Sequence, residues 1–120
     1  MTVKKLSQLY YLNREIKMDK RRLHRMEACA RNEPVGKASA EAADLRGIIE
    51  AKHQQCLYER NRLERYISSI DDSLLRQIFT YRFVNGLSWA QVAAHIGGGN
   101  TEGGVKMLCY RYLRQTRKRE

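Results

Sequence analysis

Apolar residues recur at intervals of three and four along two long stretches of the chain, and the only proline lies between them. The first stretch covers residues 3–30 and the second about residues 40–70. Such spacing lines one side of a helix with apolar side chains, in the a/d pattern of a coiled coil. Pro34 cannot donate a backbone hydrogen bond and Gly36 permits positive φ, so we expect a turn across residues 31–37. The sequence therefore predicts two long helices joined by a short turn.

These two helices are expected to form an antiparallel hairpin, because each apolar stripe must be buried against a partner. Ser39 is the expected N-cap of the second helix, since its hydroxyl can accept an unpaired backbone N–H. Folding about residue 36 places the stripe residues in three facing pairs: Leu23 with Ile49, Ile16 with Cys56, and Leu9 with Leu63. Lys20 and Glu27 interrupt the first stripe. Apolar residues also remain off the stripes, so we expect a homodimer through this hairpin.

Three shorter helices are predicted over the last fifty residues. They cover residues 73–84, residues 89–96, and a segment that ends near Gln115. Ser88 is the expected cap of the middle helix, and either Asn100 or Thr101 caps the last one. We therefore expect an all-α chain with a helical hairpin over residues 1–70 and a three-helix unit over residues 71–120.

The charge of the chain favours a polyanionic partner. The formal net charge is +10 in 120 residues, and a field of this sign attracts nucleic acid or an anionic membrane surface. The sequence has no apolar run of about 18 residues, so no membrane span is expected. The first residues carry charges every few positions and lack a signal-peptide core, which predicts a cytoplasmic protein.

Side chains suited to metal binding or catalysis are scattered in the sequence. Cys29, Cys56 and Cys109 are far apart and include no CxxC pair, so neither a disulfide framework nor a metal site is expected. Asp71 and Asp72 are explained by helix capping, and the glycine run at residues 97–99 lacks the Lys-Ser/Thr of a phosphate-binding loop. We therefore expect no cofactor and no enzymatic activity.

A helix, a glycine turn and a second helix outline a DNA-binding helix-turn-helix. Residues 74–97, LLRQIFTYRFVNGLSWAQVAAHIG, resemble the C-terminal DNA-binding region of bacterial sigma factors, known as region 4. The likeness covers about residues 73–115, and the motifs that carry it are Tyr81-Arg82-Phe83, Gly86-Leu87-Ser88-Trp89 and Val92-Ala93. The resemblance implies that the last helix reads DNA in the major groove.

The turn before this last helix departs from the family pattern by two residues. In the family, inward apolar residues follow the turn glycine by six and nine positions, where this chain has Gly103 and Lys106. A shift of two brings Val105 and Leu108 to the inward positions. Gly103-Gly104 has two explanations that the sequence leaves open: close approach of the backbone to DNA, or a helix that starts late.

We expect two roles for the residues in and near the last helix, which is the expected recognition helix. The base-reading residues are Thr101, Glu102, Gly103, Lys106, Met107 and Tyr110. Lys106 can donate to guanine, and Glu102 can accept from cytosine N4. A second group is expected to contact phosphates, which positions the protein on the duplex but does not select a base sequence. This group is Ser88, Gln91, Asn100, Arg111, Arg114, Arg117, Lys118 and Arg119. The expected core residues of this helix are Val105, Leu108, Cys109 and Tyr112.

The sequence favours a transcriptional regulator that binds double-stranded DNA. Small proteins that join helical N-terminal segments to a sigma-like reader occur in phages and prophages, so the resemblance implies a regulator of this type. RNA polymerase is a second candidate partner. Two alternatives stay open: a DNA-packaging recognition subunit similar to small terminases, and a module whose hairpin binds a protein such as RNA polymerase.

Overall fold

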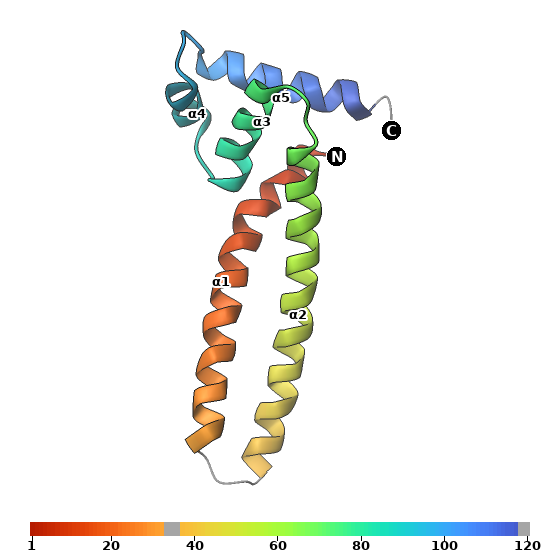
Figure 1. Cartoon of the computed structure of the whole chain (residues 1–120), viewed down its shortest axis with the longest axis vertical. Coiled ribbons are helices and arrows are strands. Elements are labelled where there is room, and N and C mark those ends of the chain that lie inside the picture. Colours follow the sequence, from red (N-terminus) through yellow and green to blue (C-terminus); the bar gives the residue numbers. More distant parts are fainter. Residues whose placement is uncertain (33–36, 118–120) are drawn as a thin grey trace. The chain divides into compact units, whose positions relative to one another are not determined.

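The computed structural model describes residues 1–32 and 37–117 (Figure 1). Their α-helices are α1 (Val3–Asn32), α2 (Lys37–Ser68), α3 (Ser73–Phe79), α4 (Trp89–Ile96) and α5 (Glu102–Arg117), and the π-helix η1 (Thr80–Val84) continues α3. These residues contain no strand, so the all-α prediction is confirmed. None of the helices in these ranges has the length and apolar character needed to cross a membrane. Most of the expected turn at residues 31–37 lies outside the described residues, as do Lys118 and Arg119.

The chain divides into two compact units that do not follow the expected boundary at residue 70. The hairpin unit is Leu12–Arg60, and the terminal unit combines Met1–Tyr11 with Asn61–Glu120. Both ends of the predicted hairpin thus group with the C-terminal helices. One cause is visible inside the terminal unit, where the ring of Tyr10 lies against Gly86.

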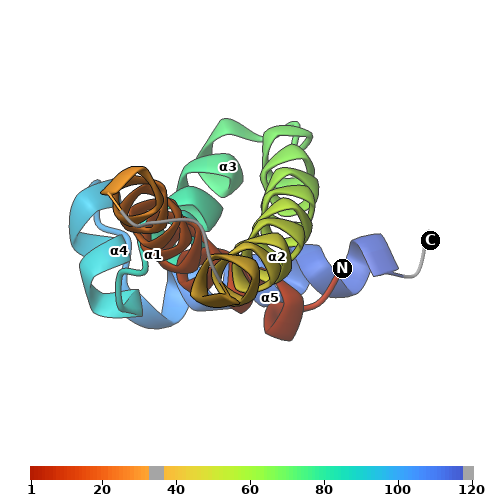
Figure 2. The same cartoon turned by 90° about the horizontal axis from the view of Figure 1, so that it is seen from below.

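In the hairpin unit, α1 and α2 lie side by side and run in opposite directions (Figures 1 and 2). Lys52 Nζ is 3.0 Å from Asp19 Oδ1 and 3.3 Å from Glu15 Oε2. Cys56 Sγ donates to Glu15 Oε1 over 3.4 Å. Glu15 adjoins Ile16, the residue that the sequence pairs with Cys56, so these contacts agree with the expected antiparallel register.

The buried stripe of α1 differs from the predicted one at Lys20, and none of residues 24–31 is buried. Ile16 is buried, but Lys20 is exposed and Asp19 is buried in its place. Residues three and four positions after Ile16 both fall near the same side of a helix. The carboxylate takes the inner position because it pairs with the Lys52 ammonium. Across the unit, Ile49 and Cys56 are buried as well, whereas Leu23 is half-buried.

The start of α2 corrects one capping prediction. The helix begins at Lys37, so Ser39 lies inside it and is not its N-cap. Ala38 and Ala40 flank this serine, and alanine has the strongest helix propensity of all residues. The local preference for helix therefore outweighs the capping preference of the serine.

The helix expected over residues 73–84 is divided into α3 and η1. Asp72 caps α3, because its Oδ1 accepts from Leu75 N over 3.0 Å. The wider π turn at the other end is closed by the bond from Asn85 N to Thr80 O, 3.0 Å long. Gly86 follows with a φ of +69°, in the left-handed region that favours glycine.

Helices α3, α4 and α5 pack on one another in the terminal unit around an apolar core. Phe79 is fully buried and meets Phe83 and Tyr112 edge-on, with ring centroids 5.5 and 5.7 Å apart. The other buried residues of this unit are Leu6, Leu9, Leu63, Ile67, Ile70, Ile78, Trp89, Val92, Ala93, Val105, Cys109 and Leu113. This core holds α5 along one side and leaves its other side exposed.

Candidate nucleic-acid interface

Helix α4 has the bounds that the sequence predicts, and a reciprocal cap fixes its start. Ser88 Oγ accepts from Gln91 N over 3.2 Å, and Gln91 Oε1 accepts from Ser88 N over 2.9 Å. Both side chains are exposed, although both also serve the cap. Their first role is therefore structural, and only the hydroxyl proton of Ser88 and the amide N–H₂ of Gln91 remain as donors for a phosphate.

The turn between α4 and α5 depends on three consecutive glycines. Gly97, Gly98 and Gly99 have φ values of 68°, 62° and 80°, which residues with a Cβ adopt only at a cost. Asn100 closes this turn, since its Nδ2 donates to Gly97 O over 2.7 Å. The amide of Asn100, expected at a phosphate, is thus engaged in the turn.

Helix α5 starts at Glu102. This start answers two questions that the sequence left open: which residue caps the helix, and whether the helix starts late. Thr101 Oγ1 accepts from Gly104 N over 3.0 Å, so Thr101 and not Asn100 caps the helix. Gly103 and Gly104 lie in the first turn, and a late start is therefore wrong. Gly103 is exposed, with open space where a Cβ would be.

The outward side of α5 carries most of the residues that the sequence placed there. Val105, Cys109 and Leu113 form the fully buried side, whereas Leu108 and Tyr112 are only partly buried. The exposed residues are Glu102, Gly103, Lys106, Met107, Arg111, Arg114, Gln115 and Arg117. Burial raises the pKa of Cys109 to about 12, so its thiol stays neutral inside this packing.

Tyr110 differs from the other expected base-reading residues. It is half-buried, and its ring lies edge-on to Trp89 with centroids 6.1 Å apart. Lys106 Nζ lies 5.8 Å from the centroid of the same ring. In this position, Tyr110 is better placed to hold the Lys106 side chain than to contact a base directly.

Arg82 is a functional candidate that the sequence analysis did not single out. Its guanidinium lies 4.8 Å from the Trp89 ring, and its Nη1 donates to Leu87 O over 2.8 Å. It thus supports the entry into α4 from the side of η1. Its place in the Tyr81-Arg82-Phe83 motif could have pointed to this role.

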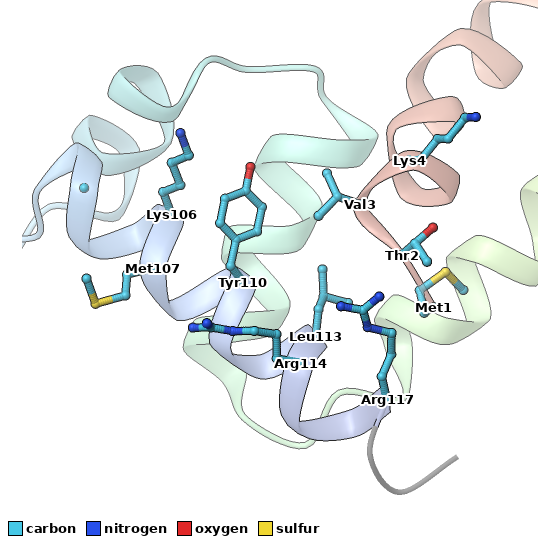
Figure 3. Close-up of a pocket in the computed structure, with 11 residues that line it drawn as sticks. Met1, Thr2, Val3, Lys4, Lys106, Met107, Tyr110, Leu113, Arg114 and Arg117 are labelled. Carbon is cyan, nitrogen blue, oxygen red and sulfur yellow. The ribbon is translucent and has the colours of Figure 1, made fainter.

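A cleft of about 700 Å³ runs along the exposed side of α5 within the terminal unit (Figure 3). One wall is the N-terminal segment Met1–Lys4, and the other is α5 from Gly103 to Arg117. The cationic residues that line it are Lys4, Lys106, Arg114 and Arg117, and none of the described lining residues is acidic. The N-terminal wall could not be predicted from local sequence patterns, because Met1–Lys4 are about a hundred positions away from α5 in the chain.

Glu15, Asp19 and Cys56 in the hairpin unit could in principle hold a metal ion, since their ligand atoms lie within 4.8 Å of one another. The Lys52 ammonium already contacts both carboxylates. Burial, followed by the bond to Glu15, raises the pKa of the Cys56 thiol and favours its protonated form. We therefore interpret the group as a charge pair that joins the two helices. Its members come from different helices, so short sequence spacing could not reveal it.

No protein-family model matches the chain, and neither a curated protein nor a solved structure shows a significant match. The likeness to sigma-factor region 4 therefore stays a prediction from the motifs in residues 74–97. Any functional conclusion depends on the geometry and charge of the described residues.

Proposed function

We propose that this protein is a transcriptional regulator that binds double-stranded DNA in a sequence-specific manner through α5. One observation carries the proposal. The exposed side of α5 gathers Lys106, Arg111, Arg114 and Arg117 on a helix whose opposite side is buried against α3 and α4. Glu102 is the only acidic residue in the helix.

The dimensions of α5 suit the major groove. Its 16 residues span roughly 24 Å at 1.5 Å per residue. A helix with its side chains is about 10–12 Å across, close to the width of the groove. In this arrangement Lys106 and Glu102 face base edges, while Arg111, Arg114 and Arg117 meet phosphates.

Binding to duplex DNA across a salt series tests the proposal. We expect the affinity to fall steeply with salt, and a selected site to be preferred over random sequence by about a thousandfold or more. Lys106→Ala should alter the preferred sequence. Lys20→Ala is the matched control, since it removes the same charge from an exposed position in the hairpin unit.

The result against the proposal is equally specific. Salt-insensitive or absent binding by the unmodified protein would exclude DNA reading by α5. Such a result would favour the alternative in which the hairpin binds a protein partner such as RNA polymerase. If Lys106→Ala weakened every sequence equally, Lys106 would be a phosphate contact and not a base reader.

We also propose that the hairpin unit joins two copies of the chain. Ile48 and Met18 are 67% and 62% exposed in this unit, and Tyr58 is 62% exposed. Large apolar side chains left in solvent support contact with a partner, and twofold dimers are the commonest assemblies. A phage or prophage origin is supported by the sigma-factor resemblance alone.

The mass in solution tests the dimer. We expect a dimer for the unmodified protein and a shift to monomer in Ile48→Asp, while Gln55→Asp serves as an exposed control on the same helix. A monomer at all concentrations would contradict the proposal. A ring of eight or more copies would favour a packaging subunit.

A further inference from the structure

The N-terminal segment of α1 is held in a defined place beside α5. Thr2 caps the helix, since its Oγ1 accepts from Lys5 N over 3.2 Å. Leu6 N donates to Thr2 O over 3.1 Å, and the Leu6 side chain is fully buried in the terminal unit. The segment is therefore a fixed wall of the cleft.

This cleft combines an apolar floor with a cationic rim. Val3, Met107, Tyr110 and Leu113 supply apolar surface to the lining. In Figure 3, Val3 points toward the side of α5 that carries Tyr110, whereas the Lys4 side chain extends away from α5. Lys4 is exposed, so a rotation of its side chain would bring the ammonium to the cleft. A ligand that fits this lining has an apolar body and several negative charges. A sugar–phosphate strand has this composition, with deoxyribose carbons between successive phosphates.

We propose that one strand of the duplex lies along this cleft, and that Lys4 contacts its phosphates together with Arg114 and Arg117. The inference rests on the proposed function, because it starts from α5 in the major groove. A helix nearly fills that groove, so the two strands that border it run directly along the helix. With α5 in the groove, one of these strands would pass between α5 and the wall formed by Met1–Lys4. Lys4 then adds a phosphate contact from the opposite end of the chain.

Two neighbouring lysines provide the test. Lys4 lines the cleft, whereas Lys5 is exposed and is not among the lining residues. Each released counterion changes the slope of log K against log salt concentration by about 0.9 on duplex DNA. Lys4→Ala should therefore make the slope less steep by about 0.9, and Lys5→Ala should leave it unchanged. Lys4→Arg should retain the slope of the unmodified protein.

The outcomes separate this inference from the proposed function. If Lys4→Ala and Lys5→Ala have the same slope while Lys106→Ala still changes sequence preference, the strand does not lie in the cleft, but α5 remains the reader. If the unmodified protein shows no salt-dependent binding to duplex DNA, both proposals fail. A reduced slope in Lys4→Ala that Lys4→Arg restores would establish the contact.

Discussion

The ring of Tyr10 lies so close to Gly86 that a Cβ on residue 86 would be 2.6 Å from Tyr10 Cδ2 and 2.9 Å from Cγ. Gly86 also has a φ of +69°, which costs a residue with a Cβ about 1–2 kcal/mol. Gly86→Ala should therefore lower the free energy of unfolding by about 2–4 kcal/mol, since overpacking adds to the backbone strain. Urea denaturation measures this loss.

Gly47 supplies the matched control for this substitution. It lies inside α2, and a methyl group on its Cα would meet nothing within 4 Å, so Gly47→Ala should stabilise the protein by about 0.5–1 kcal/mol. In the double variant Tyr10→Ala/Gly86→Ala the steric part of the cost should disappear. An equal cost of Gly86→Ala with and without the Tyr10 ring would contradict a role for this contact.

The ammonium of Lys52 offsets the charge of the buried Asp19 carboxylate. Lys52→Ala leaves that carboxylate without its cation, and we expect a loss of about 1–3 kcal/mol in the free energy of unfolding. Lys20→Ala, at the exposed neighbouring position, should change stability by less than about 0.5 kcal/mol. Equal effects of the two variants would show that the pair does not join the helices. Asp19→Asn should recover part of the loss in the Lys52→Ala background.

A substitution at Gly103 should have opposite effects on the stability of α5 and on its proposed contact with DNA. A methyl group at this position meets nothing within 4 Å, so Gly103→Ala should raise the free energy of unfolding by about 0.5–1 kcal/mol. The same methyl group should weaken DNA binding if the backbone approaches the duplex here. Gly104→Ala is the contrast, because its Cβ would lie 3.0 Å from the capping Thr101 Oγ1. Unchanged binding by the stabilised Gly103→Ala variant would rule out close approach at this residue.

The buried thiol of Cys109 should make the free energy of unfolding decrease at alkaline pH. Burial raises the pKa of its thiol from 9.0 to about 12 in the folded protein. Between these values the unfolded chain loses the proton before the folded one does, so stability is complete below pH 9 and falls as pH rises. The contribution of this thiol between pH 8 and pH 10 is about 1.4 kcal/mol. Cys109→Val should show a correspondingly smaller decline in urea denaturation, and an identical decline in both proteins would contradict the assignment.

Local patterns in the sequence were sufficient to predict most helices and several of their ends. The α4 bounds and the Ser88 cap depend on residues within four positions of one another, where propensity and capping act directly. The division of α5 into a buried and an exposed side was predicted for the same reason. The sequence could not distinguish Asn100 from Thr101 as a cap, because both side chains accept the same kind of hydrogen bond.

Contacts between distant residues were decided only by the tertiary structure. The division into units, the burial of Asp19 in place of Lys20, and the wall of Met1–Lys4 beside α5 each join segments far apart in the chain. Tyr110 was assigned to base reading from its helical phase, yet its ring is held between Trp89 and Lys106. The periodicity of a helix determines which residues share a side, whereas the partner of that side depends on the packing of other elements.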